Sequence, residues 1–156
     1  MNRKLRVLVA DDHNVVRAGL RALINAQADM EVVAEAADGE DACLRTAESE
    51  PDVAVMDVSM PVLGGAFATE RIKRLLPGVK VLALTVHEDR SYLQQILQAG
   101  ASGYVLKRAA AEELIQAIRS VARGGTYLDP ALADKVLGGL FGRPVPTGHP
   151  PGSRLS

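Results

Sequence analysis

Short apolar runs alternate along this chain with longer segments in which apolar residues recur every three or four positions. Five such runs are present: 5–10, 31–36, 53–56, 79–84 and 103–106. Runs of this length, rich in valine, leucine and alanine, are typical of strands that are buried on both faces of a sheet. The pattern therefore predicts five short strands in the interior of the protein.

The segments between these runs predict amphipathic helices. Apolar residues recur at helical spacing at Val16, Leu20, Leu23 and Ile24; at Ala68, Ile72 and Leu75; at Leu93, Ile96 and Leu97; and at Leu114, Ile118 and Val121. The segment 40–49 has a weaker repeat but is rich in residues that favour helices. Strands that alternate with helices in this way predict an α/β fold, a parallel sheet covered by helices on both faces.

The last part of the sequence differs from the rest. The dipeptide Asp129-Pro130 predicts the start of a short sixth helix that runs to about Leu137, because proline favours the first turn of a helix. From Gly138 onward the sequence is dense in glycine and proline and is typical of a linker. We expect one domain over residues 1–124, followed by a short helix and a linker over residues 125–156.

Composition narrows the class of protein. The chain has 156 residues and a formal net charge of −1, which gives no overall bias toward nucleic acid or anionic membranes. A single cysteine, Cys43, excludes an internal disulfide and suits a reducing compartment. The N-terminal apolar run is too short for a signal peptide, and no segment has the length of a membrane span. We expect a soluble, cytoplasmic protein.

Polar side chains stand at the carboxyl ends of four of the five predicted strands. The first strand is followed by Asp11 and Asp12, the third by Asp57, the fourth by Thr85 and the fifth by Lys107. The carboxyl ends of parallel strands meet at one edge of a sheet, so we expect these five residues to lie close together. Each of them alone is more often a helix cap or a surface charge. Their joint placement makes coincidence a poor explanation.

This set of residue types points to phosphoryl transfer. Three neighbouring carboxylates repel each other, and without a cation at least one of them would take up a proton. Mg²⁺ prefers a few carboxylates together with water and phosphate oxygens. Lys107 and Thr85 would then supply the positive charge and the hydrogen-bond donor that an added phosphoryl group needs. A carboxylate such as Asp57 can attack phosphorus to form an acyl phosphate.

The sequence resembles the receiver domains of bacterial two-component response regulators of the NarL/FixJ (LuxR) type. The resemblance covers residues 5 to about 122 and rests on VLVADDH, VVAEAADGEDA, PDVAVMDVSMP, VLALTVHED and ASGYVLK, in the order and spacing of the family. It implies a flavodoxin-like (CheY-like), doubly wound sheet of five parallel strands in the order 2-1-3-4-5, with five helices. It also implies a sensor histidine kinase as the phosphoryl donor.

The resemblance implies a role for each residue that matches the family. Asp57 would accept the phosphoryl group. Asp12 and Asp57, with the backbone carbonyl of Ser59, would hold Mg²⁺, and Asp11 would act largely through water. Lys107 would contact the phosphoryl oxygens.

Further residues match positions that act in switching. Thr85 would move to hydrogen-bond the phosphoryl group, and Tyr104 matches the aromatic residue whose ring turns inward as the threonine moves. Ser59 and His87 occupy positions that tune the rates of phosphorylation and dephosphorylation. The face built from the fourth helix, the fifth strand and the fifth helix would repack. This face, or the one built from the first and fifth helices, would mediate homodimerisation.

Members of this family normally continue into a helix-turn-helix domain that binds DNA. Leu155-Ser156 stands where that domain would open, so we expect the chain to be part of a longer transcription regulator, with a stand-alone receiver as the alternative. The chain itself contains no recognition helix and no basic stripe, and we expect it not to bind DNA specifically.

The sequence fits three other classes of protein less well. A phosphatase of the haloacid dehalogenase kind needs a second acid two residues after the nucleophile, where this chain has Ser59. A nucleotide-binding protein of related fold needs a glycine-rich loop after the first strand, where this chain has Asp11 and Asp12. A pseudo-receiver would act by protein contact alone, but the complete set of acids, threonine and lysine argues against it.

Overall fold

The computed structural model describes residues 3–60, 64–86, 90–107 and 111–128. Within them, six parallel strands form one sheet in the order β2-β1-β3-β4-β5-β6. The strands are β1 (Leu5–Ala10), β2 (Met30–Ala36), β3 (Val53–Asp57), β4 (Lys80–Thr85), β5 (Gly103–Leu106) and β6 (Tyr127–Leu128). The helices are α1 (Asn14–Asn25), α2 (Gly39–Ser49), α3 (Gly65–Leu75), α4 (Arg90–Gln98) and α5 (Ala111–Ala122).

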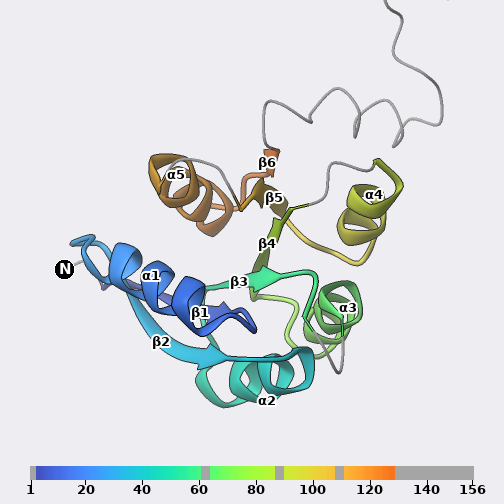
Figure 1. Ribbon diagram of the computed structural model, residues 1–156, viewed down its shortest axis with the longest axis horizontal. Coiled ribbons are helices and arrows are strands. Elements are labelled where there is room, and N and C mark those ends of the chain that lie inside the picture. The colour runs from blue at the N-terminus through green and yellow to red at the C-terminus, as the bar shows by residue number, and fades with distance from the viewer. Residues whose placement is uncertain (1–2, 61–63, 87–89, 108–110, 129–156) are drawn as a thin grey trace, which may run out of the picture.

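Helices cover both faces of the sheet, as the alternating pattern predicted. Figure 1 shows α1 and α5 on one face and α2, α3 and α4 on the other. Alternate residues of β3 divide between the two layers: Val53 and Val55 pack with Ile118 of α5, whereas Ala54 and Met56 pack on the side of α2 and α3. Burial on both faces explains why the strands read as continuous apolar runs. It also makes the central strands a rigid support for their carboxyl ends.

Two positions of the predicted apolar stripes do not face the core. Leu75 is 66% exposed and Val16 is 40% exposed. Leu75 is the last residue of α3, and Leu76, four positions after Ile72, packs against the core in its place. Val16 lies in the first turn of α1, ahead of Leu20 and Leu23, which pack against the core. The prediction was therefore wrong at these two helix ends, where a spacing rule cannot tell which residue the neighbouring layer still covers.

The sheet has one more strand than the five that were predicted. Tyr127 and Leu128 pair with Gly103 and Tyr104 of β5 and extend the sheet at that edge. A side-chain carbon at Gly103 would overlap the carbonyl oxygen of Tyr127, so the glycine permits this close pairing. Two residues are too few to show a periodic pattern, which explains why the strand was missed. The predicted sixth helix and the linker lie outside the described residues.

In the described part of the chain, no helix combines the length and the apolar character needed to cross a membrane.

Candidate functional site

The predicted residues meet at the carboxyl edge of the sheet. Asp11 directly follows β1, Asp57 ends β3, Thr85 ends β4, and Lys107 directly follows β5. Asp11, Asp57 and Thr85 are buried, with exposed fractions of 2% or less, whereas Asp12 lies at the surface. The parallel arrangement of the strands therefore brings residues from four distant parts of the sequence to one place.

Lys107 joins two of the buried acids. Its ammonium lies 2.9 Å from Asp11 Oδ2 and 3.1 Å from Asp57 Oδ2. Burial alone would lower the pKa of Lys107, but hydrogen bonds and charge attraction from Asp11 and Asp57 outweigh it and raise this pKa above its ordinary 10.5. The lysine is therefore charged, and its single positive charge offsets part of the charge of the two buried carboxylates.

The carboxylate of Asp57 is held at both of its oxygens. Oδ2 contacts Lys107, and Oδ1 accepts a hydrogen bond of 3.0 Å from the backbone N–H of Ser59. The N–H of Val58, the residue after Asp57, donates to the carbonyl of Leu84 and so ties the end of β3 to β4. The side chain at the end of this buried strand has little freedom to move.

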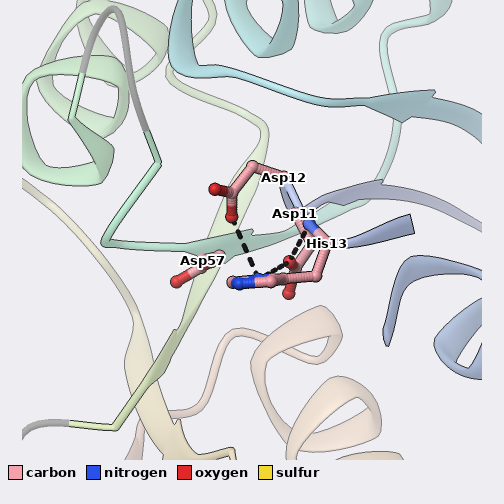
Figure 2. Close-up of side chains that lie close together, drawn as sticks. All are labelled: Asp11, Asp12, His13 and Asp57. Atoms are coloured by element: carbon pink, nitrogen blue, oxygen red, sulfur yellow. Dashed lines mark hydrogen bonds and ion pairs between the residues drawn. The ribbon is translucent and has the colours of Figure 1, made fainter. Parts of the chain in front are cut away.

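A residue that sequence reasoning left without a role, His13, completes the cluster. Its Nδ1 lies 3.1 Å from Asp11 Oδ1 and 3.1 Å from Asp12 Oδ1, and its backbone N–H donates to Asp11 Oδ1 at 2.8 Å. Figure 2 shows the imidazole beside both acids, with Asp57 next to it. In the sequence, its position directly after two acids and before a predicted helix could have indicated this role.

The cluster has the donors that a divalent cation requires. Asp11, Asp12, His13 and Asp57 each offer one ligand atom, and these atoms all lie within 4.8 Å of one another. Among the described residues, the Lys107 ammonium contacts two of the three carboxylates, Asp11 and Asp57, and its one charge does not balance the three acids. Carboxylate oxygens at this density suit a hard cation such as Mg²⁺.

The structure describes three of the remaining candidate residues, Thr85, Tyr104 and Ser59. The backbone carbonyl of Thr85 accepts a hydrogen bond of 2.8 Å from the N–H of Lys107. Tyr104 is fully buried in β5 and packs with Leu93 and Ile96 of α4. Ser59 is exposed and contributes its N–H to Asp57. His87 lies outside the described residues.

A parallel sheet of this order, helices on both faces and an acid–lysine cluster at the carboxyl edge define a flavodoxin-like protein of the CheY-like class. A family model described as "Response regulator receiver domain" matches residues 7–119. The chain belongs to this family, which confirms the resemblance stated from its sequence motifs.

Similar proteins agree with this assignment. The oxygen regulatory protein NreC of Staphylococcus carnosus is 45% identical over 134 residues, which make up 85% of this chain and 62% of that protein. The chain thus spans about 62% of the length of the curated relatives it matches.

Solved structures give the same picture. A LuxR-family response regulator from Aurantimonas sp. SI85-9A1 superposes with a TM-score of 0.83 at 36% identity, covering 88% of this chain and 99% of that one. The receiver domain of the putative response regulator NarL from Mycobacterium tuberculosis gives 0.76 at 33% identity, covering 78% and 98%. The chain is a receiver domain of a LuxR-family response regulator, and hence a signalling domain.

Proposed function

We propose that this chain is a phosphorylation switch in which Asp57 accepts a phosphoryl group from a sensor histidine kinase. One observation carries the proposal: Asp57 is a buried carboxylate at a strand end, held between the Lys107 ammonium and a backbone N–H and adjoining two further acids. A carboxylate that served only as a structural ion-pair partner would not need the unbalanced acids beside it.

The acids of the cluster fit a bound Mg²⁺. Asp11, Asp12 and Asp57, with the backbone carbonyl of Ser59, are the groups that would hold it, and Asp11 would do so largely through water. When bound, Mg²⁺ supplies positive charge against the negative charge that gathers between the carboxylate and the phosphoryl group.

The transfer step balances with groups of this chain. An oxygen of Asp57 attacks the phosphorus of a phosphohistidine, the phosphorus–nitrogen bond breaks, and the imidazole leaves with the electron pair and takes up a proton. The Lys107 ammonium, which now contacts Asp57 Oδ2, then pairs with the phosphoryl oxygens. The Thr85 hydroxyl donates a hydrogen bond to the same oxygens.

The change at the site would reach the rest of the domain through Tyr104 and the residues of α4 that pack against it. Phosphorylation adds charge and acceptor oxygens at the sheet edge, which stabilises a conformer in which Thr85 has shifted toward them. Tyr104 and α4 pack together, so the face built from α4, β5 and α5 repacks and favours homodimerisation. In a longer protein this change would control a helix-turn-helix domain that binds DNA, whereas the present chain alone would not bind DNA.

Intact mass spectrometry tests the proposal. After incubation with Mg²⁺ and acetyl phosphate, the wild type should gain one phosphoryl group, and the gain should disappear with Asp57→Asn or with EDTA. Asp41→Asn, which changes a carboxylate of α2 outside the site, is the matched control and should gain the group normally. Size-exclusion chromatography of the phosphorylated sample should show the dimer.

Two results would contradict the proposal. The first is a folded wild-type protein that gains no mass, which would favour a pseudo-receiver that acts by protein contact. The second is a gain that persists in Asp57→Asn, which would place the acceptor elsewhere.

A further inference from the structure

Arg17, on the first turns of α1, contacts the residue after β1, the first residue of its own helix and β2, next to the acid cluster. Its Nη1 donates to the backbone carbonyl of Asp11 at 2.6 Å, and its Nη2 donates to Asn14 Oδ1 at 2.8 Å. Its Nε donates to Glu35 Oε1 of β2 at 3.2 Å. The side chain is only 19% exposed. A planar guanidinium with several fixed donors can make these contacts at once.

The contact with the Asp11 carbonyl bears directly on the acids. That carbonyl belongs to the peptide group that joins Asp11 to Asp12, so its orientation sets the direction in which the chain presents both carboxylates. The N–H of Asp11 is already fixed by a 3.0 Å hydrogen bond to the carbonyl of Ala36 on β2. Arg17 therefore restrains the other end of the same residue.

The effect of Arg17 on the site is geometric rather than electrostatic. Glu35 accepts hydrogen bonds from both Arg17 and Arg21, so its carboxylate offsets much of the positive charge that these two residues bring. What remains is the restraint on the peptide. A lysine at position 17 would keep the charge but would lose the fixed fork of donors.

We propose that Arg17 is a positioning residue of the cation site: it orients the peptide between Asp11 and Asp12 and so prepares the two carboxylates for a divalent cation. This role rests on one part of the proposed function, that the acids hold Mg²⁺. The competing explanation is that Arg17 merely docks α1 on β2 through Glu35.

Arg21 is a matched control for that explanation. It lies four residues further along α1, and its Nη1 donates to Glu35 Oε2 at 2.9 Å. Among the described residues, its hydrogen bond and ion pair are with Glu35 and do not reach Asp11. Arg21→Met should therefore weaken the docking of α1 on β2 and leave the peptide between the acids in place.

Isothermal titration calorimetry with Mg²⁺ alone tests the proposal on the wild type, Arg17→Lys, Arg17→Met and Arg21→Met. Circular dichroism first establishes a temperature at which all four proteins are folded. We expect both Arg17 variants to bind Mg²⁺ about tenfold more weakly, because residues that orient metal ligands typically contribute a factor of about 10 to 100. The affinity of Arg21→Met for Mg²⁺ should stay within about twofold of that of the wild type.

The rate of phosphorylation by acetyl phosphate gives a second measurement. The Mg²⁺ concentration for half-maximal rate should rise in the Arg17 variants by the same factor as the dissociation constant. The rate at saturating Mg²⁺ should return close to that of the wild type, since the acids themselves are intact. A purely structural defect would lower the melting temperature without this split.

The results separate the two proposals. Wild-type affinity for Mg²⁺ in Arg17→Met, or an equal loss in Arg21→Met, would overturn the role of Arg17 and leave phosphorylation of Asp57 standing. A weakened affinity in the Arg17 variants alone, with no phosphoryl gain by the wild type, would support Arg17 and contradict the proposed function. A wild type that binds no Mg²⁺ would overturn both.

Discussion

Replacing Lys107 by methionine would remove the only cation that contacts both Asp11 and Asp57 in the described structure. Methionine keeps most of the length of the side chain and its apolar stem. The two buried carboxylates would then face each other and Asp12 without compensation. We expect the metal-free variant to be less stable than the wild type, and Mg²⁺ to restore most of the difference.

The size of the effect follows from the contacts. Removing one partner of a buried ion pair costs about 3–5 kcal/mol. The Lys107 side chain is 16% exposed, so the lower end of that range, about 3 kcal/mol, applies. For a domain of this size such a loss lowers the melting temperature by roughly 10 °C. Mg²⁺ should stabilise the variant more than the wild type, because it no longer competes with the ammonium for the acids.

Urea unfolding followed by circular dichroism measures this, once with EDTA and once with Mg²⁺. Lys4→Met, which changes an exposed lysine outside the site, is the control and should match the wild type. In the double variant Lys107→Met/Asp57→Asn, the loss should be smaller than in Lys107→Met alone. The reasoning is refuted if Lys107→Met is as stable as the wild type in EDTA, or if Mg²⁺ stabilises both proteins equally.

The raised pKa of Lys107 predicts a pH signature for the same pair. Its folded-state pKa lies above the ordinary 10.5, so its contribution to stability is complete below pH 10.5 and is lost as the pH rises through the folded-state pKa. The unfolding free energy of the wild type should therefore fall more steeply than that of Lys107→Met in this alkaline range.

Three further changes probe the framework of the site. Although partial burial opposes its charge, the hydrogen bond from the N–H of Arg6 lowers the pKa of Asp52 below 3.8. Asp52→Asn should therefore cost about 1 kcal/mol at neutral pH, and the gap to the wild type in urea unfolding should close as the pH falls through the folded-state pKa. Glu50 ends α2 with φ of 45°. Glu50→Gly should raise the unfolding free energy by about 0.5 kcal/mol, because glycine adopts this conformation without strain. Gly103→Ala would place a carbon against the carbonyl of Tyr127 and should cost about 2 kcal/mol; an unchanged melting temperature would contradict the close pairing of β5 and β6.

Much of the site was predictable because it depends on a rule of parallel sheets. Once the apolar runs are taken as parallel strands, their carboxyl ends must lie at one edge, whatever the details of packing. Asp11, Asp57, Thr85 and Lys107 each end or directly follow a run, so their meeting required only the element order. The structure places these residues at the ends of neighbouring parallel strands. The contacts of Lys107 with two of the acids were not predicted, and the roles given to the residues stay predictions.

Features that depend on side-chain reach were missed. His13 follows two acids, but only the turn into α1 directs its Nδ1 toward both of them. The second predicted strand, 31–36, was not among the four with a polar side chain at the carboxyl end, yet Glu35 near its end accepts a hydrogen bond from Arg17, which in turn contacts Asp11. No spacing rule links positions 17 and 35, because these residues lie on α1 and β2 and meet only once the two elements pack together.

The sequence by itself determined the class of fold, the family and the place of the acid cluster. Hydrophobic periodicity and the alternation of strands and helices can be seen along the chain without knowledge of packing. The tertiary structure alone decided which helix-end residues are covered, that a two-residue strand adds to the sheet, and which donors restrain the acids. These are contacts between segments far apart in the chain. In a close-packed interior, differences of a few tenths of an ångström decide whether such a contact forms, and no pattern along the sequence gives them.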